Sequence, residues 1–433
     1  MKWELKKREA PQGCGSTAML EFSDQGYRYF PPKPNRWVEG AVRWLNKAFI
    51  LPGKGHRISE VVVDNPEVVS AARAQAGKRL LFLPNHPTHS DPQIMTEVLR
   101  QMKTQGSFMA AYDVFLRGRF AAWCMQRMGC FSVDRDGSDR ASMKEAVGIL
   151  KSGKRSLVIF PEGNVYLMND SVTPFLEGPA FIGLKAQKEL GEETSVLAIP
   201  VSIKVTHLTD ARPAVNQLLE RLALKVGAEI NQSTDVLVEL VRLGLLAVQK
   251  VLSGLLRSLP EGAEHEHVFS TLRNVASEMI ENLEDQLDIV PAEGEELTNR
   301  IRKVRRKVHS LRIADPPTLA DFKARTLAAE AMVAYRLLTY PGDYLITNPT
   351  LDRMSETVEK ILEDLRSEPL PPLAPRRALV RFGDPIDLVE ERKNANDRSL
   401  VTTLTKRFES EVQTGVDHLN AENDCLGAEL FRQ

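Results

Sequence analysis

Short apolar runs alternate with helical patterns between residues 61 and 210, and this alternation constrains the fold more than any other feature of the chain. The apolar runs predict strands at 79–84, 107–111, 130–133, 155–160 and 196–205. The intervening patterns predict helices at 92–103, 117–128, 139–152 and 176–190. Such alternation is typical of α/β domains, so we expect a central mixed sheet flanked by helices.

Two polar segments directly follow predicted strands. Asn85–Pro92 reads Asn-His-Pro-Thr-His-Ser-Asp-Pro, and Phe160–Gly163 reads Phe-Pro-Glu-Gly. Because open α/β sheets bind their ligands at the carboxyl ends of strands, we expect both segments at the functional site. We further expect Asp91 to cap the next helix and Pro92 to be its first helical residue.

His86 and Asp91 stand five positions apart in the first segment. A histidine whose ring is held by a carboxylate can take a proton from a hydroxyl near neutral pH. The alternative is that Asp91 only caps a helix and His86 only occupies a turn. This spacing often arises by chance, but its combination with Phe160–Gly163 favours the catalytic interpretation.

Four blocks in order resemble the glycerolipid acyltransferase family, which acylates glycerol 3-phosphate and lysophosphatidic acid. They are His86–Asp91, Gly129–Arg135, Phe160–Gly163 and Ala198–Val201, and the resemblance covers roughly residues 60–210. Asn164 stands where the family commonly has Ser or Thr, and Thr88 stands where Ser is common. Both replacements preserve hydrogen-bonding capacity.

The resemblance implies transfer of a fatty acyl group from acyl-CoA or acyl-carrier protein to the hydroxyl of a phosphorylated glycerol acceptor. His86 would be the general base, and Asp91 would fix its tautomer. Arg135 would bind the acceptor phosphate through its planar guanidinium. The residues that would line the acceptor are Glu162, Gly163 and Asn164. Supporting roles are expected for Asn85, Thr88 and Pro161.

His86, His89 and Asp91 also raise the alternative of a metal site, because histidine and carboxylate clusters bind zinc. Their spacing is not that of metallo-hydrolases, and the sequence shows no second cluster, so we expect neither a metal nor a cofactor. His265-Glu266-His267 lies in a polar stretch and is interpreted as a solvated helix end.

Composition excludes several other classes of protein. The 433 residues carry a net charge of −1, so nothing in the overall charge calls for nucleic acid. The four cysteines (Cys14, Cys124, Cys130 and Cys425) are scattered, and no signal-peptide pattern precedes them, which favours a cytoplasmic protein. No run of eighteen apolar residues occurs, so we expect no membrane-spanning helix. The family resemblance implies a peripheral association with a membrane surface that supplies a lysophospholipid.

The remaining chain divides by pattern. We expect an N-terminal segment with an amphipathic helix (1–60, with 1–30 unstructured), the acyltransferase domain (61–211, completed by a strand at 376–390), a long mostly α-helical insertion before the last strand (212–366) and a helical tail (391–433). In the first segment, Trp37 and Trp44 accompany aliphatics and cations at helical spacing up to Ile50. This helix either lies in a membrane interface or packs on the catalytic core.

Two further alternatives stay open. The basic helix Arg300–Arg312 is either a docking face for anionic lipid or acyl-carrier protein, or a solvated face paired with Glu293, Glu295 and Glu296. The protein as a whole could instead acylate a different amphiphilic acceptor, or be a non-catalytic lipid-binding protein on the same fold. Intact His86, Asp91, Glu162 and Arg135 favour an enzyme.

Overall fold

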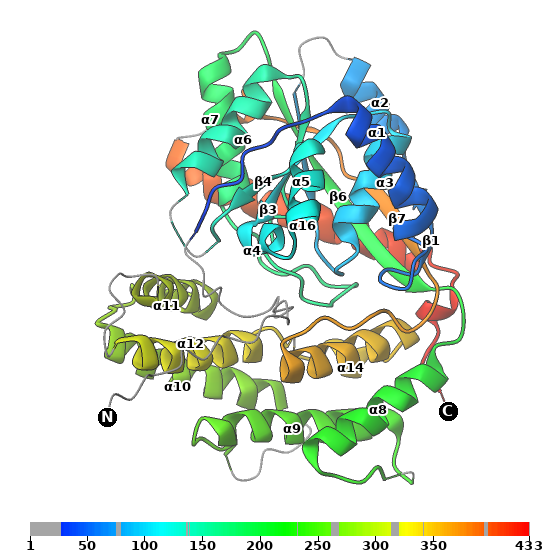
Figure 1. The fold of residues 1–433 in the computed structure, drawn as a ribbon, viewed down its shortest axis with the longest axis vertical. Helices are drawn as coiled ribbons and strands as arrows, with labels where there is room; N and C mark the ends of the chain where they lie inside the picture. Colours follow the sequence, from blue (N-terminus) through cyan, green and yellow to red (C-terminus); the bar gives the residue numbers. More distant parts are fainter. Residues whose placement is uncertain are drawn as a thin grey trace, which may run out of the picture.

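The computed structural model of the protein describes residues 27–74, 79–135, 137, 139–231, 233–260, 268–312, 320–340, 342–393 and 397–432. These residues form a sheet covered by helices on both faces and a group of helices gathered at one end of that sheet (Figure 1). The interpretation of His265-Glu266-His267 falls outside the described residues, as does that of most of segment 1–30.

The sheet has eight strands in the order β1-β7-β6-β2-β5-β3-β4, and β8 pairs with β6. Their bounds are β1 Ile58–Val63, β2 Arg79–Pro84, β3 Gly106–Ala111, β4 Phe131–Val133, β5 Ser156–Val158, β6 Val196–His207, β7 Arg376–Phe382 and β8 Ile386–Asp387. From β6 to β4 all neighbours are parallel, and β1 is parallel to β7. Strands β7 and β8 run antiparallel to β6, so the expected mixed sheet is confirmed.

Strand β1 was not predicted. It is an edge strand with alternating exposure, and its partner among the described strands, β7, comes more than three hundred residues later in the chain. A short half-exposed strand gives a weak sequence pattern, and its partner could not be found from local sequence. The boundary expected between residues 60 and 61 falls inside this strand.

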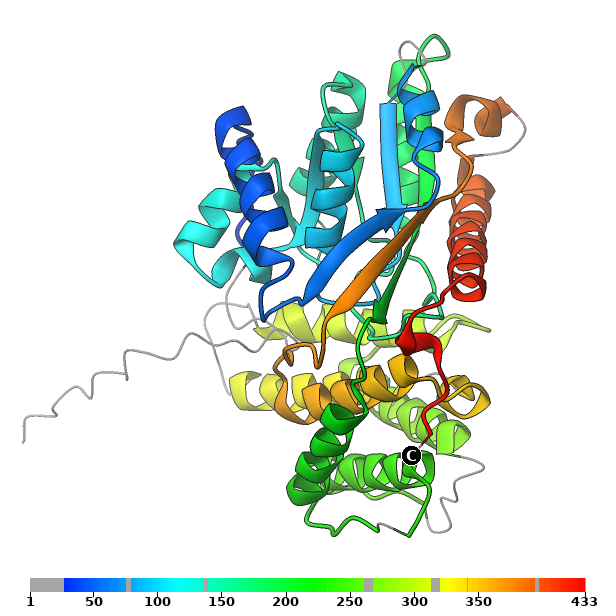
Figure 2. The ribbon, with the colours of Figure 1, turned by 90° about the vertical axis from the view of Figure 1, so that its right-hand side faces the viewer.

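Helices cover the sheet on both faces (Figure 2). One face carries α2 (Glu67–Ala74), α3 (Asp91–Gln101) and α5 (Arg119–Arg127), with α1 (Arg36–Leu45) and the π-helical turn η1 (Asn46–Ile50) beside them. The other face carries α6 (Arg140–Ser152), α7 (Gly178–Leu190) and α16 (Asp397–Ala421), with α15 (Leu388–Lys393) against α7 and α16. Helix α16 buries Leu400, Leu404, Phe408 and Val412, which recur every four residues and so form one face.

The predicted helical insertion lies between β6 and β7, as expected. It comprises α8 (Arg212–Val226), α9 (Val236–Gly254), α10 (Val268–Leu287), α11 (Leu297–Arg312), α12 (Ala320–Leu337), α13 (Tyr344–Thr347) and α14 (Leu351–Arg366). These helices share two apolar cores of their own, separate from those beside the sheet. Among the described helices, none has the length and apolar character needed to cross a bilayer.

Candidate active site

Four parallel strands bring the candidate residues to one edge of the sheet. Strands β2, β5, β3 and β4 are neighbours in that order, so the loops at their carboxyl ends open on the same side. These loops carry His86 after β2, Glu162 after β5 and Arg135 after β4. The short helix α4 (Tyr112–Leu116), which follows β3, adds Asp113.

His86 and Asp91 form the hydrogen-bonded pair that the sequence predicted. The Nδ1 atom of His86 lies 2.8 Å from Oδ2 of the fully buried Asp91. The same carboxylate accepts hydrogen bonds from Thr88 N at 2.8 Å and Thr88 Oγ1 at 2.7 Å. Asp91 is therefore fixed by its own loop, and its carboxylate holds the imidazole in one orientation.

Asp91 is not the helix cap that we expected. Ser90 occupies the cap position, and Asp91 and Pro92 are the first two residues of α3. A carboxylate at a helix start is favoured by the helix dipole, but here it points back to the loop and accepts from Thr88 rather than from the next turn. The prediction was wrong by one residue, and the side chain serves His86 instead.

The ring of His86 stacks on Phe160, with centroids 4.3 Å apart and an interplanar angle of 28°. Phe160 belongs to the second motif, so the two motif loops are in direct contact. Among the described residues, no protein group hydrogen-bonds Nε2 of His86. One ring nitrogen is thus committed to Asp91, and the other can accept a proton from a ligand.

Glu162 connects the two motif loops. One of its oxygens accepts from His86 N at 2.6 Å, and the other accepts from Thr173 N at 3.1 Å and from the Thr173 hydroxyl. Burial raises the pKa of Glu162 to about 7, against the lowering effect of these hydrogen bonds. These hydrogen bonds position the backbone of His86, and the expected role of Glu162 in lining the acceptor stays a prediction.

The turn after Glu162 depends on glycine. Gly163 has a φ of +74°, and a Cβ at this residue would lie 2.5 Å from Cδ1 of Leu176. Any side chain would therefore be strained both by the backbone conformation and by this contact. Pro161 is buried, and its carbonyl accepts from Leu176 N at 2.8 Å, which closes the same turn.

Arg135 reaches across to the second motif loop. Its Nη1 lies 3.3 Å from the carbonyl of Gly163 and 3.4 Å from Oδ1 of Asn164, and its Nη2 lies 3.4 Å from Oδ1 of Asp113. These contacts are long for hydrogen bonds to an arginine, and the side chain is about one third exposed (32%). The guanidinium lies beside the second motif loop, at the carboxyl ends of the strands, and remains accessible to an anion.

Asn85 and Thr88 hold the first motif loop from inside. The amide of Asn85 makes both hydrogen bonds to the backbone of Ile203 in β6, donating at 3.0 Å and accepting at 2.7 Å. Thr88 adds a bond from Ser90 N to its hydroxyl at 3.1 Å. These bonds fix the loop, and the supporting roles expected for both residues at the site stay predictions.

His89 belongs to a different contact. Its Nε2 lies 3.0 Å from Oε2 of Glu363 in α14, the last helix of the insertion. The same face of α14 places Glu356 against Asn169 and Asp352 against His207 and Lys204. His89 therefore ties the catalytic loop to the insertion and does not join His86 and Asp91.

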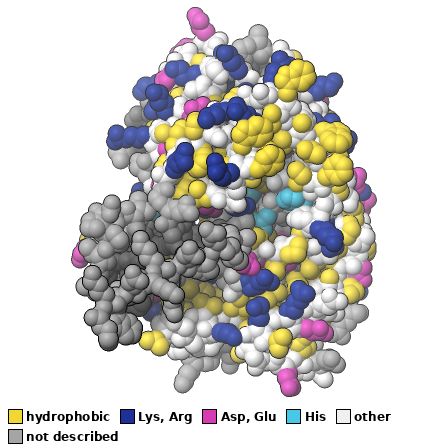
Figure 3. Space-filling model, viewed as in Figure 1, with side chains coloured by type: hydrophobic (Ala, Val, Ile, Leu, Met, Phe, Trp, Pro, Cys, Tyr) yellow, Lys and Arg dark blue, Asp and Glu magenta, His cyan; other side chains and the backbone are white. Residues whose placement is uncertain are grey.

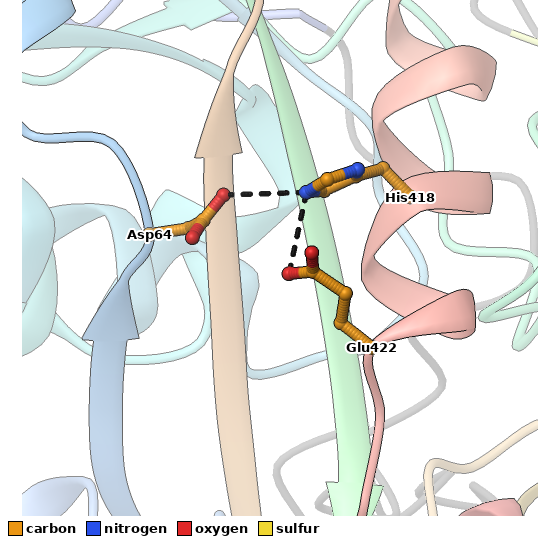
Figure 4. Close-up of side chains that lie close together, drawn as sticks. All are labelled: Asp64, His418 and Glu422. Carbon is orange, nitrogen blue, oxygen red and sulfur yellow. Dashed lines mark ion pairs between the residues drawn. The ribbon is translucent and has the colours of Figure 1, made fainter.

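Among the described residues, one group of three has ligand atoms close enough for a metal ion: Asp64, His418 and Glu422 (Figure 4). His418 Nε2 lies 3.7 Å from Asp64 and 3.3 Å from Glu422, at the edge of the sheet near β1. Asp64 also forms an ion pair with Arg381. The two carboxylates and the imidazole are all substantially exposed, as is usual for surface ion pairs.

Helix α1 buries its polar side. Glu39 is 3% exposed and pairs with Arg43 at 2.7 Å and with Arg155 at 2.9 Å. Asn46, at the start of η1, donates to the carbonyl of Gln93 at 2.9 Å. The helix thus packs on the catalytic core through charge pairs and hydrogen bonds.

The opposite side of the same helix is apolar and open. Trp37 is 89% exposed, and Trp44 and Phe49 are each 61% exposed. Phe120 and Trp123 of α5, a neighbour of α1, extend this aromatic surface. Apolar side chains gather over this region in Figure 3, on the same face on which histidine side chains are visible between the two halves of the molecule.

Several residues at the site were missed by the sequence reasoning. Asp113 follows β3, so the strand-end rule could have found it. Tyr335 could not be found in this way, because it comes from α12. Its hydroxyl shares a hydrogen bond of 2.6 Å with the hydroxyl of Tyr166 and accepts from Nδ2 of Asn164 at 3.3 Å. Nothing local to a helix in the insertion indicates that it reaches the catalytic loops.

Comparison with known proteins agrees with the geometry. Residues 60–204 match the Acyltransferase family, so this part of the chain is an acyltransferase-family domain. A stretch of 79 residues is 32% identical to the 1-acyl-sn-glycerol-3-phosphate acyltransferase of Streptococcus pneumoniae, a distant homologue. That alignment covers 18% of this chain and 29% of the relative, so the chain spans less than a third of the relative's length. The insertion lies outside the family match.

Proposed function

We propose that the protein transfers a fatty acyl group from acyl-CoA or acyl-carrier protein to the hydroxyl of a phosphorylated glycerol acceptor, lysophosphatidic acid or glycerol 3-phosphate. The observation that carries the proposal is the His86–Asp91 pair at 2.8 Å, placed at the end of β2 with Nε2 of His86 available. The acyltransferase-family domain supplies the reaction class, and the partial similarity to a 1-acylglycerol-3-phosphate enzyme suggests the acceptor.

In this proposal His86 acts as general base. Its Nε2 takes the proton of the acceptor hydroxyl as the oxygen attacks the thioester carbonyl, and the carbon–sulfur bond breaks as the tetrahedral intermediate collapses. The proton then passes from the imidazolium to the leaving thiolate. Asp91 stabilises the imidazolium between these steps. The reaction consumes one thioester and one alcohol and releases one ester and one thiol, with no resident cofactor or metal.

Arg135 is the proposed ligand of the acceptor phosphate, with Gly163 and Asn164 beside it. Its contacts with Gly163 and Asn164 are long, and a phosphate beside them would offer short, charge-assisted hydrogen bonds. Arg135→Ala should raise the KM of a phosphorylated acceptor far more than that of the acyl donor. Arg135→Lys should recover only part of this loss, because the two-pronged guanidinium is absent.

The exposed aromatic surface of α1 and η1 is the proposed contact with the membrane that carries the acceptor. Two tryptophans and a phenylalanine at the surface, with cations on the same segment, suit an interfacial helix. We infer a cytoplasmic, peripheral protein. Replacing Trp37 and Trp44 with Ser should weaken binding to anionic vesicles while barely changing transfer to a soluble short-chain acceptor.

The deciding experiment gives the purified protein a labelled acyl-CoA or acyl-carrier protein and a panel of acceptors, with analysis of the lipid products. The panel contains glycerol 3-phosphate, lysophosphatidic acid, an unphosphorylated monoacylglycerol and an amphiphilic amine. Product from the phosphorylated glycerols supports the proposal. Product from another acceptor alone would replace the acceptor, and binding without turnover of any acceptor would indicate a lipid-binding protein.

A further inference from the structure

The insertion reaches the loops that carry the proposed acceptor residues. Its helix α12 places the hydroxyl of Tyr335 at 2.6 Å from that of Tyr166 and at 3.3 Å from Nδ2 of Asn164. Asn164 in turn contacts Arg135 through its Oδ1. Arg135, Asn164 and Tyr335 therefore form a continuous chain of contacts from β4 to the insertion.

Helix α11 adds positive charge to this chain. Its apolar residues Ile301, Val304 and Val308 face the core of the insertion. A second stripe, Arg302, Arg305 and His309, has i, i+3 and i+7 spacing, which places these three side chains on one side of the helix.

Arg305 contacts Tyr335, and His309 contacts the loop after β4. The guanidinium of Arg305 lies over the ring of Tyr335, 4.5 Å from its centroid. His309 Nε2 lies 3.6 Å from Oδ2 of Asp134, the neighbour of Arg135. Burial raises the pKa of the Tyr166 phenol well above its usual range, and the positive charge of Arg302 acts in the opposite direction.

The solvated-face expectation for this basic helix fits one of its sides, and docking of anionic lipid or acyl-carrier protein stays a prediction. Lys303, Arg306 and Lys307 are exposed, and Lys303 pairs with Glu295 at 2.6 Å, as expected of a solvated face. Arg302 and Arg305 are half-buried, and Arg305 lies over the ring of Tyr335. Tyr335 and Asn164 link Arg305 to Arg135, and two cations linked in this way suit a shared anionic ligand.

We propose that Arg305 and Tyr335 are specificity-determining residues for the acceptor, and that they form the second wall of the site that binds its phosphate monoester. This inference rests on the proposed function and deepens it. Arg135 holds the phosphate from the catalytic domain, and Arg305, oriented by the ring of Tyr335, adds charge from the insertion. Because the insertion lies outside the family match, this chain selects its acceptor with residues that the acyltransferase-family domain does not contain.

The test compares Arg305→Gln with Lys303→Gln, a matched loss of one charge on the exposed side of the same helix. Arg305→Gln should raise the KM of lysophosphatidic acid or glycerol 3-phosphate about tenfold, the effect of one charge-assisted hydrogen bond, with little change in donor KM. Arg305→Lys should recover part of the affinity. Tyr335→Phe keeps the ring under Arg305 but removes the hydroxyl, and it should produce a smaller increase.

The KM of monoacylglycerol, an acceptor without phosphate, distinguishes a role in phosphate binding from a purely structural role. Arg305→Gln should leave the KM of this acceptor unchanged. An equal increase for both acceptors, an increase in donor KM instead, or behaviour identical to Lys303→Gln overturns the inference. Thermal melting of each variant checks that the fold is intact, and Arg305→Lys tests the role if Arg305→Gln does not fold.

The outcome also separates this inference from the proposed function. If the unchanged protein acylates no phosphorylated glycerol, the proposed function fails before any variant is compared. If it does, and Arg135→Ala raises the acceptor KM while Arg305→Gln and Tyr335→Phe do not, only the role of the insertion fails.

Discussion

Two histidine–carboxylate pairs lie in one loop of the molecule, and they are built in different ways. His86 bonds through Nδ1 to Asp91, a residue of the same loop, and its ring stacks on Phe160. His89 bonds through Nε2 to Glu363, which lies 274 residues away in the insertion. The two pairs have nearly the same separation, 2.8 and 3.0 Å, so distance does not distinguish them.

The two pairs differ in which ring nitrogen stays available for chemistry and in which groups hold the carboxylate in place. Asp91 is held by Thr88 and commits Nδ1, so Nε2 of His86 is left for chemistry. In the second pair Nε2 is the committed atom, and its carboxylate also accepts from Leu370 N at 2.6 Å. A histidine–carboxylate pair therefore indicates catalysis only when Nε2 of the histidine stays available at the carboxyl ends of the strands.

The comparison predicts its largest effect in the histidines themselves. His86→Gln should lower kcat by about two to four decades, because His86 is the proposed base that takes the hydroxyl proton. His89→Gln should lower it by less than about tenfold, since His89 only joins the loop to α14. The measurement is steady-state acyl transfer on both variants, with thermal melting to verify the fold. Equal losses would mean that the two histidines act as one unit.

Substitution of the two carboxylates should also affect kcat more in the first pair than in the second, with smaller losses than for the histidines. Asp91→Asn should lower kcat on the order of a hundredfold, the lower end for acid–base catalysis, because the imidazole loses its charged partner and its fixed tautomer. Glu363→Gln should leave kcat near that of the unchanged protein but lower the melting temperature, since Glu363 joins α14 to the catalytic loop. A larger kinetic loss at Glu363 than at Asp91 would reverse the comparison.

The first pair could be predicted from sequence, and the second could not. His86 and Asp91 are close in the chain, and a strand before them and a helix after them fix the turn. Glu363 and Tyr335 lie on helices whose patterns show only an apolar side, so nothing in the sequence states which distant loop they meet. The same limit applies to α1: periodicity identified two faces, but only the structure shows that the polar one, with Glu39, is buried.

The surroundings of the second pair should respond to pH. Burial raises the pKa of Glu356 to about 8 and that of Glu359 to about 7, both on the face of α14 that meets the catalytic domain. A raised pKa means that the fold favours the protonated acid. The contribution to stability is therefore present below the ordinary value of 4.5 and is lost as pH rises through 7 to 8.

We thus expect the melting temperature to fall between pH 6 and pH 9, and Glu356→Gln to reduce this fall. Glu189→Gln is the control, because Glu189 is a surface residue whose pKa is lowered by its hydrogen bond to Lys151. The control should keep the slope of the unchanged protein. Circular dichroism melts across the pH range give the answer, and a slope that Glu356→Gln leaves intact would show that Glu356 does not control it.

Chelation should have the smallest effect. The experiment tests whether the two histidine–carboxylate pairs form one metal site. If His86, His89 and Asp91 bound one ion, their donor atoms would have to converge. Instead the Asp91 oxygens accept from Thr88 and His86, and the outer nitrogen of His89 is bonded to Glu363. A zinc ion would have to break these bonds before it gained its ligands.

We therefore expect acyl transfer to be unchanged after treatment with a chelator, because a base and the acceptor's own hydroxyl supply the nucleophile without a Lewis acid. Metal analysis of the purified protein provides a second reading, in which the surface group of Asp64, His418 and Glu422 is the competing source of any bound ion. A variant with His418→Ala distinguishes the two origins. Reversible loss of activity that zinc or magnesium restores, and that persists in His418→Ala, would place the ion at the histidine loop and make His89 a ligand rather than a tether.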